Sequence, residues 1–395
     1  MRLGNIKRVV LVVVIILVLS VGAGVGLGFA FDMYIPIIKE REKEEWNQSY
    51  LMDRWKDVRI YEKRENATMD ELISDIKDET PDDEVKTEQT VQKENFYSKF
   101  NIIDEDSFEK YLSNNPKDIE EGYDSIFIDK ADLSNTATGI KTIHGDDVFV
   151  IDTYNEIVIV GTKINNVNVK VAIAMNNEQV SLSVADNLTY WEKIDRHATK
   201  ENAVLAMNAS GYNWNKAGDY ASLYGATIRE GRIIRKYTNQ ENLIGFTKDG
   251  QLSFGAEETI ENYYNACEYY PIIINDGVSV FQKEDTEEDE EEVNEEVTEV
   301  QAGAERLPRS AIGQTKDGSI IMLVTDYGEG IGLTEEEVAD IMYTYGCEKA
   351  AMLSNEIKTI MWWNGRIINN CYSYDDGGIK LPNSWVIKYN PEVFR

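Results

Sequence analysis

The sequence predicts an α+β fold, in which a strand-rich domain of twisted sheets with few helices follows one transmembrane helix and a polar stalk. An uncharged apolar run stands near the N-terminus, and a polar, acidic stretch follows it. From about residue 146, short β-branched runs alternate with Asn, Asp and Gly turns, which is typical of strands. We therefore expect a cytoplasmic tail (1–8), a membrane anchor (9–31), an acidic stalk or linker (32–135) and a folded domain (136–395).

The predicted anchor, residues 9–31, contains no charged side chain and is long enough to cross a bilayer of roughly 30 Å. Arg2, Lys7 and Arg8 precede it and an acidic segment follows it. Because cations flanking a span stay on the cytoplasmic side, we expect a single-pass protein of the cell membrane with its C-terminal domain outside the cell. A cleaved signal peptide is the alternative, although its apolar core would be shorter and would end at a small-residue cleavage site.

Glycines recur along this span, at Gly22, Gly24, Gly26 and Gly28. Their spacing allows two helices to approach closely, which predicts a homodimer through the span. Glycine as ordinary filler of a membrane helix is the alternative. A structural protein that only dimerises in the membrane is accordingly one of three functional hypotheses.

The stalk divides into two parts by composition. Residues 35–65 mix charges at helical spacing with a few apolar positions, so we expect a helix that leaves the membrane. Residues 78–95 are acidic and poor in apolar side chains, which is typical of a solvated linker.

The chain is strongly acidic, with 40 Lys and Arg against 71 Asp and Glu, or a net charge of −31. Such a field repels nucleic acid and anionic lipid, so we expect neither as a partner, and it also works against an anionic substrate. A dense carboxylate run forms an acidic insertion at 283–303, which we interpret as a solvated loop. The run lacks the Asp/Asn spacing and turn glycine of an ordered calcium loop, so we predict no metal and no cofactor.

Cysteine and histidine are scarce. Cys267, Cys347 and Cys371 lie in apolar or aromatic surroundings, and an odd number cannot form a complete set of disulfides, so we expect buried free thiols. His144 and His197 are the only histidines, and no Cys/His cluster has zinc spacing. Neither zinc chemistry nor a serine–histidine triad is supported.

The folded domain is predicted mainly as strands. We expect them at 148–152, 156–163, 167–175, 203–208, 224–229, 243–247, 270–274, 319–326, 359–363 and 384–389, with a helical segment at 188–198. A second helix is well marked. Thr334 and Glu337 have the spacing of a capping box, and Gly346 supplies the stop. Its apolar face consists of Val338, Ile341, Met342 and Tyr345.

Several motifs together resemble the phosphodiester glycosidase family. They are Pro308–Gly313, Asp326, Gly332–Thr334, Gly346–Cys347 and, upstream, the turn after strand 203–208. The resemblance covers roughly residues 140–391. It implies hydrolysis of sugar-1-phosphodiesters, such as release of N-acetylglucosamine from a phosphate. For the bacterial branch it also implies an association with exopolysaccharide, so the expected partner is a cell-envelope glycan or sugar phosphodiester.

The residue types at these positions suit that chemistry. Asn208 and Ser210 end a strand, where amide and hydroxyl groups can bind sugar hydroxyls or a phosphate oxygen. Arg309 has the planar fork that binds phosphate at two points, and Asp326 is a candidate catalytic acid or base. Two other roles stay open: Arg309 as the structural partner of a surface carboxylate, and Asp326 as a cap of the turn at Tyr327–Gly328.

The chain departs from the family after Leu353. The family has Asp-Gly-Gly-Gly there, whereas this chain has Ser354, Asn355, Glu356 and Ile357. Glycines permit a positive φ and a close approach of backbone to phosphate, and we expect side chains in their place, one of them the β-branched Ile357, to block both. Ser354 thus becomes a candidate substrate-binding residue and Glu356 a displaced catalytic carboxylate. Two further hypotheses remain open: a membrane-tethered glycosidase, and a catalytically degenerate member that binds glycan or protein.

Overall fold

The computed structural model describes residues 88–187, 191–214, 221–223, 225–236, 243–255, 260–268, 271–281, 305–328 and 332–391. The predicted tail, the anchor at 9–31, the helix at 35–65 and the insertion at 283–303 lie outside them. No helix within the described ranges is long and apolar enough to cross a membrane. The described residues all belong to one unit, Pro81–Arg395.

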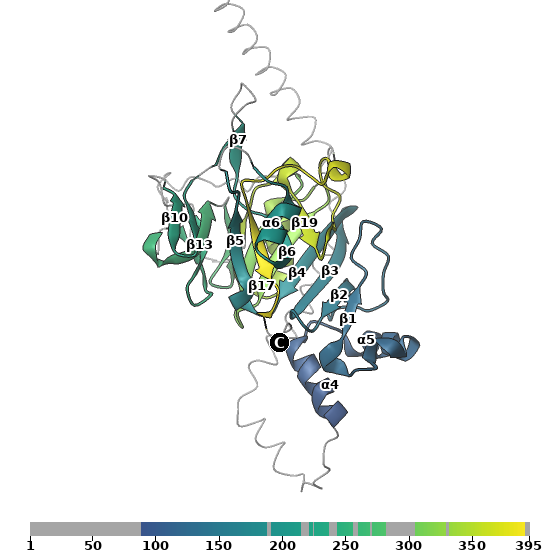
Figure 1. Ribbon diagram of the computed structural model, residues 1–395. Coiled ribbons are helices and arrows are strands. Elements are labelled where there is room, and N and C mark those ends of the chain that lie inside the picture. Colours follow the sequence, from purple (N-terminus) through teal and green to yellow (C-terminus); the bar gives the residue numbers. More distant parts are fainter. Residues whose placement is uncertain are drawn as a thin grey trace, which may run out of the picture. The chain divides into compact units, whose positions relative to one another are not determined.

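Antiparallel sheets dominate this unit, as the predicted α+β class requires (Figure 1). The largest has nine strands in the order β1 (Phe127–Asp129), β2 (Asp147–Asp152), β3 (Ile157–Ile164), β4 (Val167–Ala174), β17 (Ile320–Thr325), β16 (Ser310–Thr315), β18 (Cys347–Met352), β14 (Ile272–Asn275) and β15 (Val278–Ser279). A second sheet has the order β20 (Arg366–Ile367), β19 (Met361–Trp363), β6 (Ala203–Asn208), β21 (Asn383–Lys388) and β5 (Val180–Val184).

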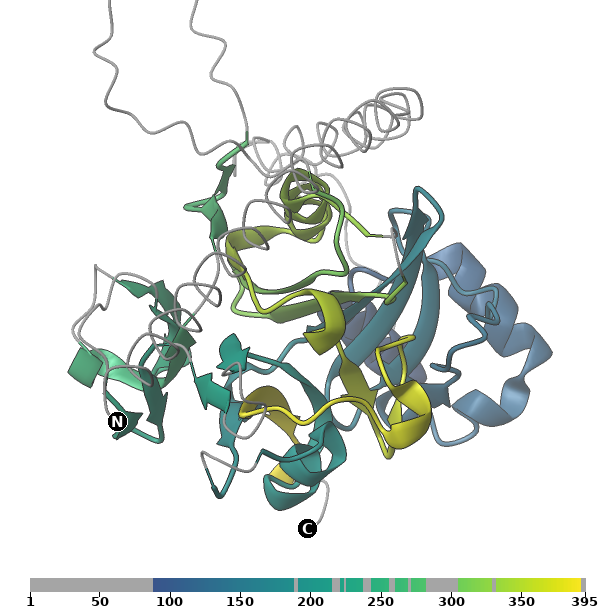
Figure 2. The same cartoon turned by 90° about the horizontal axis from the view of Figure 1, so that it is seen from above.

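A third sheet follows the order β10 (Arg232–Arg235), β9 (Thr227–Arg229), β13 (Tyr263–Glu268), β11 (Leu243–Thr247) and β12 (Leu252–Phe254). In Figures 1 and 2 it lies to one side of the other two sheets, next to β5. A short hairpin pairs β7 (Tyr212–Trp214) with β8 (Ala221–Leu223).

Two apolar cores follow from the alternation of side chains along the central strands. In β3, Val158 and Val160 face one core, whereas Ile157 and Ile159 face the other. The first core lies between the nine-stranded sheet and the helices α4 (Glu88–Lys99), α5 (Glu105–Asn114) and α7 (Glu335–Thr344). The second lies between the nine-stranded sheet and the second sheet and also includes residues of the third sheet. Helix α6 (Ile194–Lys200) covers the outer face of the second sheet. Since both faces of the nine-stranded sheet are buried, its strands are apolar along their length.

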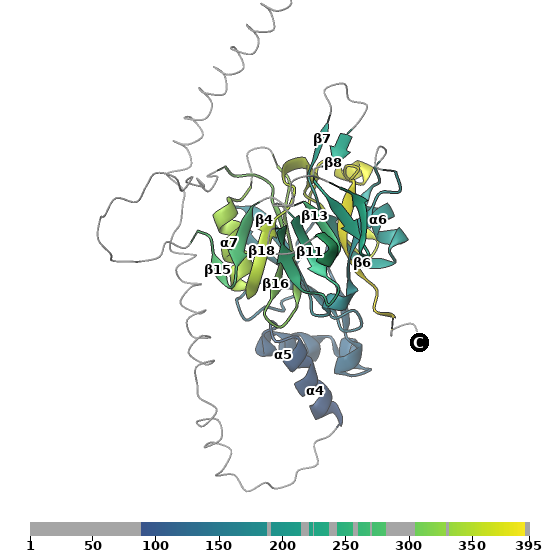
Figure 3. The same ribbon diagram turned by 90° about the vertical axis from the view of Figure 1, so that its left-hand side faces the viewer.

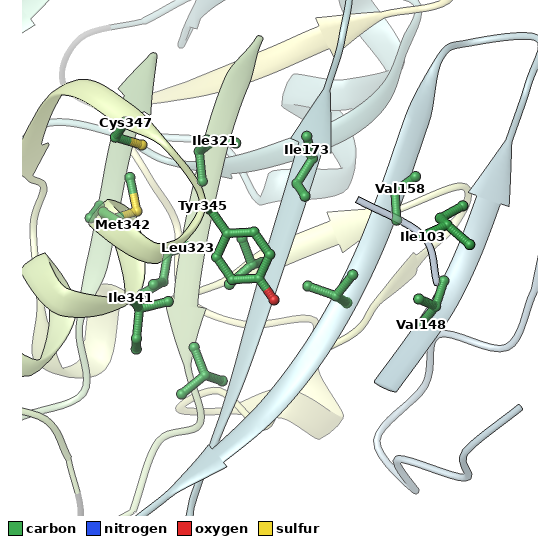
Figure 4. Close-up of a cluster of buried hydrophobic side chains, with 14 of the residues drawn as sticks. Ile103, Val148, Val158, Ile173, Ile321, Leu323, Ile341, Met342, Tyr345 and Cys347 are labelled. Carbon is green, nitrogen blue, oxygen red and sulfur yellow. The ribbon is translucent and has the colours of Figure 1, made fainter. Parts of the chain in front are cut away.

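Helix α7 is built as the sequence predicts. Thr334 and Glu337 form a complete capping box. Figure 4 shows Ile341 and Met342 of this helix facing Leu323 of β17 within the first core. The glycine before the cap is required, because a Cβ on Gly332 would stand 2.1 Å from the carbonyl carbon of Leu307.

The predicted linker at 78–95 is wrong for residues 88–95, which belong to helix α4. Phe96 of α4 stacks on Phe100, which directly follows that helix, and on Phe108 of α5, and all three are buried in the first core. Figure 3 shows α4 and α5 together at one end of the sheets. Residues 88–129, assigned above to the stalk, are thus part of the folded unit, because a narrow aromatic stripe suffices to bury otherwise polar helices.

Candidate functional site

Polar side chains gather where β6 ends and β16 begins. Asn208 ends β6, Ser310 begins β16 and Ser354 follows β18, and all three are fully buried. Asn208 Nδ2 lies 2.8 Å from Ser310 Oγ, 2.8 Å from the Ser354 carbonyl oxygen and 3.2 Å from Ser354 Oγ. Asn208 Oδ1 accepts the Ile360 N–H at 3.1 Å. Because both ends of the amide are engaged, Asn208 ties three chain segments together.

Ser210 joins this cluster through a residue on β21. Its backbone N–H and its hydroxyl both donate to Asn383 Oδ1, at 3.0 Å and 2.8 Å. Among the residues that the structure describes, Asn383 Nδ2, Ser384 Oγ and Thr359 Oγ1 have no hydrogen-bond partner although all three atoms are buried. An unpartnered buried polar group costs about 1–3 kcal/mol, so three of them around Asn208 and Ser210 mark a candidate binding site.

The side chain of Arg309 points to the opposite face of the nine-stranded sheet from the side chain of Ser310, which begins β16. Neighbouring residues in a strand point to opposite faces, so Ser310 and Ile312 face the space between the sheets while Arg309 and Ala311 face the helices. The Arg309 side chain is buried. Its Nε donates to the Leu333 carbonyl at 3.0 Å, and its terminal nitrogens contact Glu335 at 3.3 Å and the Glu305 carbonyl at 2.8 Å.

These contacts favour the structural role that was left open for Arg309. Burial lowers the pKa of the Arg309 guanidinium, and the carboxylates of Glu335, Glu305 and Glu356 oppose that shift. The structure therefore brings Arg309 to the start of α7 and not into the Asn208 cluster.

The loop at 354–357, where the resemblance leads us to expect glycines, keeps one feature of a glycine loop. Glu356 adopts φ = 59°, in the left-handed region, so the expectation that side chains prevent a positive φ here is wrong at this position. A non-glycine residue in this conformation costs roughly 1–2 kcal/mol. The loop is fixed by backbone bonds from Ser354 to Ala209 (3.2 Å) and from Glu356 to Pro308 (2.9 Å). The Glu356 side chain is exposed.

Asp326 follows β17 and lies opposite Asn168. Its Oδ2 accepts from Asn168 Nδ2 at 2.8 Å and its Oδ1 accepts from the Asn370 N–H at 2.8 Å. These bonds run to neighbouring segments and not to the turn at Tyr327–Gly328, which favours a site role over turn capping. Burial raises the pKa of the Asp326 carboxyl, against the effect of these hydrogen bonds and of Lys170.

One asparagine connects Asp326 to the Asn208 cluster. Asn369 Nδ2 lies 3.2 Å from the Thr325 carbonyl oxygen and 3.4 Å from that of Thr359. Thr359 adjoins Ile360, whose N–H is bound by Asn208. The structure therefore places Asp326, Asn208, Ser210 and Ser354 at one continuous region, with the Glu356 loop at its border.

Two lysines supply positive charge near this region. Lys170 lies on the same face of the nine-stranded sheet as Asp326, with its Nζ 4.0 Å from the centre of the Phe149 ring, and donates to Asn135. Burial lowers the pKa of Lys170 to about 8, and the carboxylate of Asp326 opposes this shift. Lys358, on the Glu356 loop, is partly buried, and burial lowers its pKa as well.

The histidines and cysteines stand apart from this region. His197 Nδ1 lies 2.9 Å from Ser183 Oγ and its Nε2 lies 3.0 Å from the Leu381 carbonyl, but the imidazole is fully buried. All three cysteines are buried and unpaired, as expected. The described ranges contain no group of three or more His, Cys, Asp or Glu side chains placed to hold a metal.

Sequence reasoning missed several members of the region, namely Asn168, Ser310, Asn369, Asn370 and Asn383. A signal existed for Asn168, because it and Lys170 are the polar positions on one face of an otherwise apolar strand. Asn383 directly precedes the strand expected at 384–389 and carries no pattern of its own. The roles of Asn369 and Asn370 depend on long-range pairing, which spacing along the chain does not reveal.

Comparison with known proteins gives a family match. Residues 201–388 match the sequence model of a family described as phosphodiester glycosidase. No curated protein matches the sequence. Among solved structures, the catalytic domain of zebrafish N-acetylglucosamine-1-phosphodiester alpha-N-acetylglucosaminidase, auto-inhibited by its pro-peptide, is 15% identical with a TM-score of 0.45, over 59% of this chain and 82% of that one. A hypothetical protein from Synechocystis is 13% identical with a TM-score of 0.44, over 62% of this chain and 65% of that one.

Proposed function

Because residues 201–388 form a domain of the phosphodiester glycosidase family, we propose that this protein binds a sugar-1-phosphodiester or exopolysaccharide of the cell envelope without hydrolysing it. The main support for the proposal is that residue 354 is a serine. This neutral, fully buried side chain stands where the family has an aspartate, and its polar groups are engaged by Asn208, Ser310 and Ala209. A hydroxyl in that position cannot supply the charge of a carboxylate.

The position of Arg309 supports the same proposal. A guanidinium that contacts Glu335 and two backbone carbonyls on the helix side of the sheet does not offer its fork to a phosphate between the sheets. Lys358 is the cation on the loop that borders the site, and Asn370 presents an exposed amide beside Asp326. These groups suit recognition of a sugar and a phosphate oxygen by hydrogen bonds.

Hydrolysis is the second candidate, and one observation favours it. Asp326 is partly exposed, and burial raises the pKa of its carboxyl, which is the direction that favours a general acid. In this alternative water attacks the anomeric carbon and its proton passes to the exposed Glu356, while the bond from that carbon to the phosphate oxygen breaks and Asp326 donates a proton to the leaving oxygen. The two candidates differ in whether bound substrate is cleaved.

The proposal places this domain outside the cell, anchored in the cell membrane through residues 9–31. The uncharged run with cations before it supports the anchor and its orientation. The glycine spacing within the run supports a homodimer through the span. A tethered receptor of this kind would keep envelope glycans close to the membrane surface.

The test uses the full-length chain in detergent micelles with the methyl diester of N-acetylglucosamine-1-phosphate. We expect calorimetry to detect binding while chromatography detects no released sugar. Release of sugar that disappears in the isosteric Asp326→Asn variant would establish hydrolysis instead. No binding and no release would refute recognition of this ligand class.

A loop variant provides the matched comparison. It combines Ser354→Asp with Asn355→Gly, Glu356→Gly and Ile357→Gly. Asn208 Nδ2 already points at side chain 354, so a restored carboxylate has a hydrogen-bond donor. We expect this variant to bind the diester differently or to release sugar, and behaviour identical to the wild type would show that Ser354 does not limit catalysis.

A further inference from the structure

Two tyrosines stand beside Asp326. Tyr327 directly follows it, and Tyr372 lies two residues after Asn370, whose N–H binds the Asp326 carboxylate. Their ring centres are 5.5 Å apart with the planes at 77°, an edge-to-face pair. Tyr372 is 44% exposed and Tyr327 is partly exposed. The pair therefore presents aromatic surface to solvent directly beside the site.

The two tyrosines are held by a network of short hydrogen bonds. The Tyr327 N–H donates to the Asn370 carbonyl at 2.7 Å, and Asn370 Nδ2 donates back to the Tyr327 carbonyl at 2.9 Å. Behind Tyr372, Ser373 adopts φ = 56° and its carbonyl accepts the Gly378 N–H at 2.9 Å. The backbone on either side of the ring pair is therefore fixed, which lowers the entropic cost of placing a ligand on the pair.

We propose that Tyr327 and Tyr372 form an aromatic subsite that stacks a neutral pyranose ring of a glycan chain, next to the sugar held at Asp326. This inference rests on the proposed function, and it identifies the class of ligand that one subsite binds. One face of a pyranose is lined by C–H groups, which pack against the electron-rich face of an aromatic ring.

The surroundings argue for a neutral sugar in this subsite. Asp326 lies on one side of the tyrosine pair, and the exposed carboxylates of Asp375 and Asp376 follow Tyr372 closely in the chain. An anionic sugar would be repelled by these charges, whereas a neutral ring is not.

The experiment compares ligands of two lengths on the full-length chain in detergent. The short ligand is the methyl diester of N-acetylglucosamine-1-phosphate, and the long one is the corresponding diester of the β-1,4-linked N-acetylglucosamine disaccharide. Calorimetry measures both dissociation constants for the wild type, Tyr372→Ala and Tyr372→Phe. Tyr264→Ala, which removes a tyrosine of similar exposure (39%) on β13, is the matched control.

We expect Tyr372→Ala to weaken binding of the long ligand about tenfold, an effect typical of one lost aromatic contact, and to leave binding of the short ligand unchanged. Tyr372→Phe and Tyr264→Ala should bind both ligands as the wild type does. Unchanged binding of the short ligand also shows that the Tyr372→Ala variant is folded.

The outcomes separate the subsite from the proposed function. Equal affinity of wild type and Tyr372→Ala for the long ligand overturns the subsite alone. Equal weakening of both ligands by Tyr372→Ala also overturns it, because a neighbouring subsite cannot affect the short ligand. Failure of the wild type to bind either ligand overturns the proposed function and the subsite with it.

Discussion

The imidazole of His197 is fully enclosed between α6 and the second sheet. The Leu381 carbonyl can only accept, so Nε2 carries a hydrogen, and in the neutral ring Nδ1 accepts from the Ser183 hydroxyl. Burial lowers the pKa of His197 to about 4, from an ordinary value of 6.5. A Ser–His pair here is thus a packing contact between a helix and a sheet.

This pair makes stability depend on pH in a definite direction. Between about pH 6.5 and pH 4 the unfolded chain binds a proton at His197 that the native state does not, so the free energy of unfolding falls as the pH falls. We expect the stability advantage of the wild type over His197→Gln to shrink by about 2 kcal/mol from pH 7.5 to pH 5. Denaturant unfolding at both pH values measures this.

Other titrating groups contribute equally to the free energy of unfolding of the wild type and of His197→Gln, so their contributions cancel in the difference. Burial raises the pKa of Asp340 to about 7, for example, and this group stabilises the native state as the pH falls. His144→Gln, at the only other histidine, controls for removal of an imidazole. An unchanged stability difference between wild type and His197→Gln at the two pH values would show that His197 is protonated in the native state.

For the site, the sequence could predict which residue types are suitable but not which face of a strand each side chain occupies. The residue types at Asn208, Ser210 and Asp326 suited a polar site, and the structure does bring these three to one region. Arg309 suited a phosphate equally well, but its place one position from Ser310 turns it to the helices. Which face of a strand is the functional one depends on the sheets packed against it, so spacing along the chain does not settle it.

At the level of elements, apolar strands were the most predictable features. The expected strands at 156–163, 167–175, 203–208 and 384–389 correspond to β3, β4, β6 and β21, because strands buried on both faces have continuous β-branched sequences. Helices α4 and α5 were not predicted. Their sequences are mostly charged and polar, and the few aromatic residues that bury them become meaningful only once the sheet is in place.

The start of helix α7 has a complete capping box. The Glu337 carboxylate is buried and accepts from the Thr334 N–H at 3.0 Å and from Asn165 at 2.7 Å. It also binds Arg306 at two points, 2.8 Å and 2.9 Å. One carboxylate therefore connects the capping box to the loop before β4 and to the segment before β16.

We expect Glu337→Ala to destabilise the protein by about 3 kcal/mol, because it leaves partly buried donors of Arg306 and Asn165 without an acceptor. Thr334→Ala removes only a cap and should cost about 1 kcal/mol. Glu336→Ala, at an exposed position of the same helix turn, should change stability by less than about 0.5 kcal/mol. Denaturant unfolding ranks the three variants, and equal costs for Glu337→Ala and Thr334→Ala would contradict the bridging role of Glu337.

For the whole molecule, the packing of the N-terminal helices decides where the folded unit begins. Four apolar side chains of this segment are buried in the core beneath the nine-stranded sheet, namely Phe96 of α4, Phe100 directly after it, and Phe108 and Leu112 of α5. Strand β1 also pairs with β2 along residues 127–129. A chain that starts at residue 136 lacks all of these groups and leaves the edge of β2 unpaired, which invites aggregation.

Truncation tests this directly. Each buried Phe or Leu side chain contributes about 2–3 kcal/mol, so the loss of four approaches the total stability of roughly 5–15 kcal/mol that a domain has. We expect residues 81–395 to unfold cooperatively at the temperature of the full-length chain, and residues 136–395 to aggregate or to lose a cooperative transition. The single variant Phe108→Ala, in the 81–395 chain, should lower the free energy of unfolding by about 3–5 kcal/mol. The opposite result is cooperative unfolding of residues 136–395 at the same temperature as residues 81–395. It would show that the N-terminal helices do not contribute to the stability of the sheets and that the stalk extends to residue 135.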